Sequence, residues 1–236
     1  MSYDIEQETA TSREMLDARI PAKLKEIYRL LVEQQSELEP WRWALTVDLA
    51  QSVERNCRAL LETIGKDRLP ATAWIARNLL ELLVWVKYCG VSRENAWRFH
   101  EDALRDVKGL TEAYEKICGA AGVENETSAM AAQQIQDVAS EKLGLEDIDS
   151  NFLRVVAASK AEGVALGDKF APLHRFLSKF AHPTAGLVHG IMHQPEICTN
   201  LQAICTTHGV VFAEQSTLAI EAQLITGAPA SPAGLS

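Results

Sequence analysis

The sequence lacks the features that would place the chain outside the cell or in a membrane. Its five cysteines are an odd number and include no CxxC pair, so we expect free thiols and no disulfide framework. Residues 1–8 are acidic and contain no apolar stretch, which argues against a signal peptide. The longest apolar run, residues 79–86, contains Glu81 and is too short to cross a bilayer. These absences predict a cytoplasmic protein with no membrane partner.

The familiar motifs of nucleotide-binding and hydrolytic sites are also missing. The sequence contains no glycine-rich phosphate loop, no GxSxG elbow and no dinucleotide fingerprint, and we therefore predict no cofactor. The formal net charge is −9, from 32 acidic and 23 basic residues. A surface this acidic is poorly suited to holding nucleic acid non-specifically. Binding of RNA or of a small anion would therefore need a local concentration of positive charge.

Helical periodicity is the dominant pattern, and the alternation typical of strands is nearly absent. Hydrophobic residues make up 47% of the 236 positions, which is enough to fill a large core. We predict an all-α fold, a multi-helix bundle of about seven to eight helices. The expected organisation is an N-terminal helical segment over 1–40, a helical bundle domain over 41–226 and a disordered tail over 227–236.

Capping and breaking residues predict where helices begin and end. Thr11 and Glu14 have the spacing of a capping box, and Pro21 should kink the helix that starts there. Ser92 and Asp168 are expected to cap two later helices, and Gly65 should end another. The remaining predicted helices cover residues 41–64, 70–88, 128–143, a short stretch around 155 and 199–225.

The helix predicted over 70–88 carries one pair of charged residues, Arg77 and Glu81. Its other side chains are apolar on nearly every side, so the helix should be central and buried. Residues four apart lie on one helix face, and a charge in apolar surroundings must be paired or face a wet cavity. The pair is therefore either a structural ion pair or one wall of a polar pocket.

The segment 169–195 contains no aspartate or glutamate but holds three Lys or Arg residues and four of the six histidines. With His174 at 0° on a helical wheel, the polar residues follow at roughly 40° (Ser178), 80° (His182), 100° (Arg175) and 140° (Lys179). Such a face suits a phosphate or a carboxylate. Solvated or core histidines are the plainer interpretation of each single residue. The candidate binding residues are Arg77, Glu81, His100, His174, Ser178 and Lys179.

A metal site is a weaker hypothesis. His189 and His193 have the i, i+4 spacing that puts two ligands on one helix face. The sequence HGIMH lacks the glutamate of the zinc-peptidase pattern, and only Glu196 or His182 is near enough in sequence to serve as a third ligand. We therefore predict no metal.

Two stretches resemble the signatures of a family of uncharacterised bacterial all-helical proteins. The first is IARNLLELLVWVKYCG, which contains the RxxxE pattern of Arg77 and Glu81 and is followed by RENAWRFHEDA. The second is RFLSKFAHPTAG, which contains the SxxxH pattern of Ser178 and His182. The resemblance covers roughly residues 41–193. It implies the helical fold more than an activity.

Arg175 and His182 also resemble the spaced Arg…His motif of the HEPN superfamily, although Phe176 stands where the motif often has a polar residue. Members are commonly metal-independent ribonucleases or nucleotide-handling proteins, and many are dimers. The resemblance implies a HEPN-like core and a homodimer. In it Arg175 would hold the scissile phosphate of RNA, and His182 would move a proton. Two alternatives stay open: a non-catalytic module that binds a small anion or a partner in a polar interhelical pocket, and a buried network that is only structural.

Overall fold

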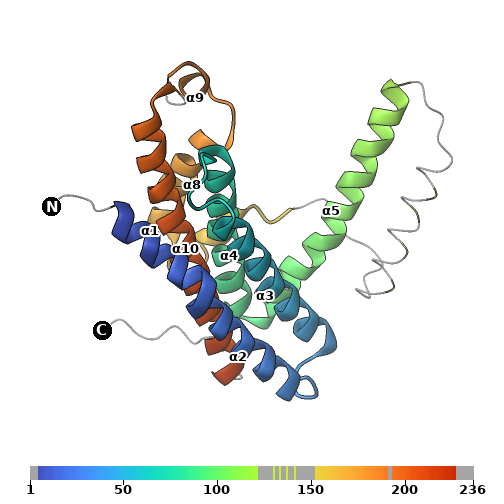
Figure 1. Cartoon of the computed structure of the whole chain (residues 1–236). Helices are drawn as coiled ribbons and strands as arrows, with labels where there is room; N and C mark the ends of the chain where they lie inside the picture. The colour runs from blue at the N-terminus through green and yellow to red at the C-terminus, as the bar shows by residue number, and fades with distance from the viewer. Residues whose placement is uncertain are drawn as a thin grey trace.

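The computed structural model describes residues 5–121, 152–190 and 193–226, together with four single positions between them. These residues form helices and no strand, which confirms the predicted all-α bundle (Figure 1). The predicted tail over 227–236 and most of the predicted helix over 128–143 lie outside the described residues. The helices are α1 (Ile5–Glu14), α2 (Ile20–Glu33), α3 (Pro40–Leu61), α4 (Leu69–Val91), α5 (Arg93–Ala120), α7 (Val155–Ser159), α8 (Gly167–Ala181), α9 (Ala185–His189) and α10 (Pro195–Thr226).

The N-terminal segment is continuous with the bundle. The kink expected at Pro21 is a π-helical turn, η1 (Met15–Arg19), between α1 and α2. Proline has no N–H for the carbonyl one turn back, and here the N–H of Ile20 bonds to the carbonyl of Met15 instead. The predicted capping box is wrong, because Thr11 lies inside α1 and its hydroxyl donates to the carbonyl of Gln7 at 2.9 Å. Both α1 and α2 pack against α10.

Helix α4 is the centre of the fold, as its all-round apolar sequence predicts. It packs against α3, α5, α8 and α10, and its contact with α10 is the most extensive in the bundle. Gly209 lets α10 approach both neighbours closely, since a Cβ there would lie 3.4 Å from Ala76 Cβ on α4 and 2.7 Å from Leu60 Cδ2 on α3. By length and composition α4 could cross a membrane, but more than half of its apolar stretch is buried inside the protein. Such burial is typical of the core helix of a bundle.

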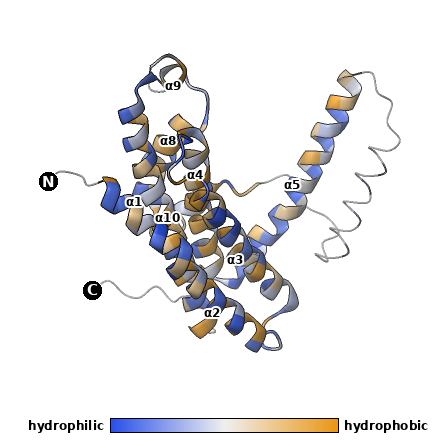
Figure 2. Ribbon diagram, in the orientation of Figure 1, coloured by the Kyte–Doolittle hydropathy of each residue, from blue (hydrophilic) through white to orange (hydrophobic). Residues whose placement is uncertain are grey.

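Helix α5 begins as predicted and then leaves the bundle. Ser92 Oγ accepts a bond from the backbone N–H of Asn95 at 3.1 Å, which is the expected N-cap. The outer half of the helix projects away from the other helices (Figure 1), and apolar positions continue along it (Figure 2). Its inner half is fixed by Asp102, which accepts bonds from Arg105 Nη1 at 2.6 Å and from the backbone N–H of Leu153 at 2.9 Å.

Helix α8 packs its apolar face, including Phe170 and Leu177, against α4. The predicted N-cap is wrong, because Leu166 occupies that position without a side-chain bond and Asp168 lies in the first turn. A carboxylate in the first turn still interacts favourably with the helix dipole. The five cysteines are free thiols, as predicted.

Candidate functional site

The two charged positions of α4 meet two histidines of α8. Arg77 Nη1 lies 2.9 Å from His182 Nε2, and Glu81 Oε1 lies 2.9 Å from His174 Nε2. These contacts show that α4 and α8 run antiparallel, and that they bring together residues about a hundred positions apart. We call Arg77, Glu81, His174 and His182 the Arg77 cluster.

Pro183 positions His182 in this cluster. The residue before a proline is driven out of the helical region, and His182 has φ −118° and ψ 151°, so α8 ends at Ala181. His182 is therefore the first residue beyond the helix instead of a continuation of its face. This departure lets the imidazole reach Arg77 on the neighbouring helix.

Three atoms at the centre of the cluster form a nearly equilateral triangle. Arg77 Nε lies 2.9 Å from Glu81 Oε1 and 3.0 Å from His174 Nε2, and the latter two atoms lie 2.9 Å apart. Arg77 Nε–H points at both Glu81 Oε1 and His174 Nε2. His174 Nε2 accepts from Arg77 Nε when it is unprotonated and donates to Glu81 Oε1 when it carries a proton. Stacking on Phe170, with ring centroids 5.2 Å apart, also holds this ring.

His182 contacts the same guanidinium at a different nitrogen. A guanidinium only donates, so His182 Nε2 accepts the bond from Arg77 Nη1 and the proton of the neutral ring lies on Nδ1. Two imidazoles thus contact different nitrogens of a single guanidinium, His174 at Nε and His182 at Nη1. This convergence of two imidazoles on one guanidinium is the chemical feature of the cluster.

The Arg77 cluster lies where α4 meets α8, and its side chains are partly exposed to solvent. The side chains of Arg77, Glu81 and His174 are 24%, 26% and 25% exposed. The second N–H of Arg77 Nη1 and both N–H groups of Nη2 have no acceptor among the residues that the structure describes. A guanidinium with spare donors facing solvent can bind a phosphate or a carboxylate in bidentate geometry.

The other candidate residues lie outside this cluster. Arg175 and Lys179 are exposed and line a shallow surface depression with Ala171, Pro172 and Phe176; within the described residues Arg175 makes no hydrogen bond or ion pair. Ser178 Oγ donates to the carbonyl of His174 at 2.6 Å, within α8. His100 lies on α5, with its ring against those of Trp41 and Trp97. The structure therefore puts Arg77, and not Arg175, beside His182.

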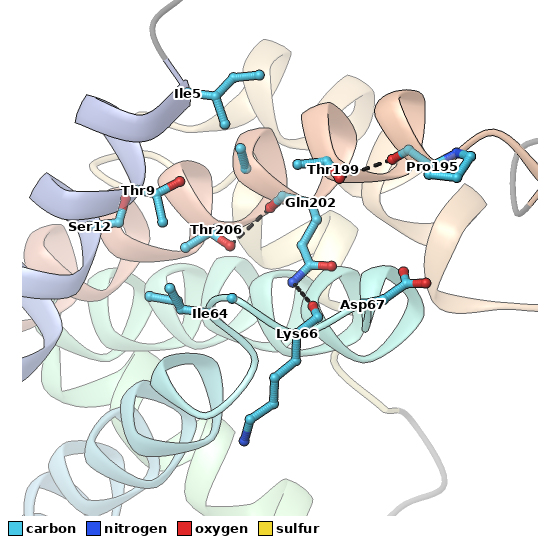
Figure 3. Close-up of a pocket in the computed structure, with 12 residues that line it drawn as sticks. Ile5, Thr9, Ser12, Ile64, Lys66, Asp67, Pro195, Thr199, Gln202 and Thr206 are labelled. Atoms are coloured by element: carbon cyan, nitrogen blue, oxygen red, sulfur yellow. Dashed lines mark hydrogen bonds between the residues drawn. The ribbon is translucent and has the colours of Figure 1, made fainter.

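The sequence did not predict a cavity of about 370 Å³ between α1, the loop after α3 and the start of α10 (Figure 3). Its floor is fixed by Gln202, whose amide donates to the carbonyls of Thr63 and Lys66 at 2.9 and 2.6 Å and accepts from the N–H of Arg68 at 3.0 Å. The cavity shares no lining residue with the Arg77 cluster. Gln202 and Thr206 are polar residues four apart on an apolar helix, as Arg77 and Glu81 are. The same sequence pattern could therefore have pointed to this cavity.

The metal hypothesis gains no support from the part of the chain that the structure describes. It contains no group of three or more His, Cys, Asp or Glu side chains that could hold a metal ion. His193 is exposed, and the side chain of His189 lies outside the described residues.

Comparisons with models of protein families, with curated proteins and with solved structures found no match to this chain. The functional proposal therefore depends on the sequence and on the geometry of the site.

Proposed function

We propose that the chain is a HEPN-like, metal-independent ribonuclease in which the Arg77 cluster cleaves RNA. The observation that carries the proposal is the convergence of two imidazoles, those of His174 and His182, on one guanidinium with unused donors. In this proposal Arg77 takes the phosphate-binding role that the HEPN resemblance implied for Arg175.

The reaction would be a transesterification at phosphorus. Arg77 would hold the scissile phosphate through its free N–H groups and stabilise the charge that develops on the non-bridging oxygens. The phosphate would replace His182 as the acceptor of the Arg77 Nη1 bond. The freed His182 Nε2 would take the proton of the 2′-hydroxyl, and the resulting oxygen would attack phosphorus. The P–O5′ bond would break, and His174, as its imidazolium, would give its Nε2 proton to the leaving oxygen. The products would be a 2′,3′-cyclic phosphate and a 5′-hydroxyl end.

Glu81 would act as a positioning residue. It accepts bonds from both Arg77 Nε and His174 Nε2, so it fixes the guanidinium and the imidazole at once. Arg175 and Lys179 would contribute to binding outside the reacting centre. Both are exposed on the acid-free segment 169–195, where they add positive charge to the surface of an otherwise acidic chain.

The test is RNA cleavage by purified protein in the presence of a chelator. His182→Ala and His174→Ala should each reduce kcat/KM by about 10²- to 10⁴-fold, with the chain still folded by circular dichroism. His193→Ala, at an exposed histidine outside the cluster, is the matched control and should leave cleavage unchanged. Undiminished cleavage by His182→Ala, or cleavage that stops on chelation, would overturn the proposal.

A non-catalytic anion-binding module is the second candidate, and the ion pair between Arg77 and Glu81 favours it. At 2.9 Å the carboxylate offsets the guanidinium charge, which suits reversible binding of a small anion as well as catalysis. This function would be supported if phosphate raised the thermal unfolding temperature of the wild-type chain but not that of Arg77→Ala, and if neither protein cleaved RNA.

All four groups of the Arg77 cluster come from one chain, so the proposed chemistry does not require a dimer.

A further inference from the structure

The sequence places Trp74 on the most buried helix, yet its side chain faces solvent. Trp74 is 53% exposed, whereas the other four tryptophans are less exposed and have packing partners. Trp41 packs edge-on against Trp97 at 4.9 Å, Trp85 packs against Phe99 at 4.6 Å, and Trp43 donates to the carbonyl of Leu31. Exposure of one apolar ring is ordinary by itself, so a binding role for Trp74 depends on what lies beside it.

Trp74 is the neighbour of Arg77 on the surface of α4. Residues three apart on a helix share a face, with Cβ atoms about 5–6 Å apart. The exposed indole therefore lies about one helical turn from Arg77, whose guanidinium has free N–H groups and contacts the imidazole of His182. An aromatic surface and an anion-binding group thus occupy adjacent positions.

We propose that Trp74 is a stacking platform for an unpaired nucleobase of the RNA whose phosphate is held by Arg77. This rests on the proposed function and narrows its substrate to single-stranded RNA. Every base has a π face, but in a duplex that face is already stacked on its neighbours. In a nucleotide one sugar joins the base to the phosphate, so base and phosphate can occupy neighbouring positions on one helix face.

The charge around Trp74 selects this occupant over a protein surface. The charged group one turn along α4 is Arg77, whose guanidinium contacts the imidazoles of His174 and His182 on α8. Glu81 is the carboxylate within this set, and it is engaged by both Arg77 and His174. An aromatic ring beside donors of this kind matches a base with its phosphate.

The experiment measures binding of two fluorescent oligonucleotides at low salt by anisotropy. One is a deoxyuridine octamer, which lacks the 2′-hydroxyl and is not cut by the proposed chemistry; the other has the same backbone with abasic sites. Trp74→Ala should weaken binding of the octamer by roughly 10-fold and leave the abasic strand unchanged. Trp74→Phe should recover part of the loss. Tyr114→Ala, at a tyrosine on α5 that is 50% exposed, is the matched control.

The outcomes separate this proposal from the proposed function. Equal binding of both strands by wild type and Trp74→Ala overturns the stacking role alone, and cleavage by His182-dependent chemistry can still stand. If Trp74→Ala weakens binding of the octamer and of the abasic strand equally, the stacking role is overturned, and the substitution acts on the surface in general. A fall in molecular mass in Trp74→Ala, with no change in oligonucleotide binding, assigns the indole to a protein interface. No binding of either strand by wild type overturns both proposals.

Discussion

Two pairs of arginine and carboxylate on neighbouring helices have almost the same spacing and very different surroundings. In α5, Arg105 and Asp102 are 4% and 9% exposed, and Asp102 also fixes the backbone of Leu153. In α4, Arg77 and Glu81 are 24% and 26% exposed and contact two histidines. The first pair is sealed inside the fold, whereas the second keeps donors available at the surface. The comparison teaches that accessible, unused donors distinguish a candidate site from a structural ion pair.

The largest expected effect on stability is at the sealed pair. Arg105→Ala leaves Asp102 buried without its main counter-charge, and we expect a loss of about 3–5 kcal/mol in the free energy of unfolding. Urea denaturation measures it. Arg29→Ala is the matched control, because that side chain is 53% exposed in its ion pairs and its loss should leave the free energy of unfolding close to that of wild type. If the two variants lost the same free energy of unfolding, burial would not distinguish the Arg105 ion pair from the exposed pairs of Arg29.

A second structural network should show an intermediate effect. Gln202→Leu leaves the carbonyls of Thr63 and Lys66 and the N–H of Arg68 without their partner. An unsatisfied buried group costs about 1–3 kcal/mol, and partial access to water in the adjacent cavity places the total near ~2 kcal/mol. Gln51→Leu, at an exposed position on α3, is the control for urea denaturation. A Gln202→Leu variant as stable as wild type would contradict the structural role of this amide.

The exposed cations beside the cluster should have a smaller effect, on binding only. Arg175→Gln combined with Lys179→Gln removes two charges that would contact phosphates. We expect a few-fold increase in KM for RNA, with kcat unchanged. We also expect a shallower salt dependence of binding, by about 0.7 log units per log unit of salt for each phosphate that is no longer neutralised. Lys25→Gln, on the exposed face of α2, is the control. A large decrease in kcat of the double variant would contradict this account and indicate that Arg175 contacts the reacting phosphate.

The smallest expected effect is a loss of stability in acid. Burial lowers the pKa of His208 on α10, so the unfolded chain takes up a proton at this position before the folded chain does. The stability that depends on a neutral His208 is full above the ordinary histidine pKa of about 6.5, and it declines as the pH falls below that value. His208→Gln should flatten this part of the profile of unfolding free energy against pH. An unchanged profile would assign the acid sensitivity to other groups.

The sequence was sufficient for the fold because its signals are local. The apolar circumference of α4 and the Ser92 cap each depend on a few neighbouring residues, and the structure confirms both. Gly65 has the positive φ of a turn residue, but α3 ends earlier than predicted, at Leu61 with Glu62 as its C-cap. The expected caps at Thr11 and Asp168 are wrong, because packing of α1 and α8 extends each helix past the local signal.

Only part of the candidate site could be predicted from the sequence. Arg77 and Glu81 could be paired because a helix fixes their separation, and His174 and His182 could be placed on one polar segment. The register between α4 and α8 depends on how buried side chains such as Phe170 and Leu177 interlock over long range, which no local pattern encodes. A helical wheel continued through His182 grouped it with Arg175, whereas Pro183 turns it out of the helix and toward Arg77.

The most direct test of the central claim is the Arg77→Ala variant assayed twice, for RNA cleavage and for the free energy of unfolding. If Arg77 belongs to a functional site, cleavage should fall by at least about 100-fold. Stability should change by only about 1 kcal/mol, since the pair is partly exposed. A variant that loses as much stability as Arg105→Ala, while its folded fraction cleaves RNA at the wild-type rate, would show that the Arg77 cluster is only a structural network.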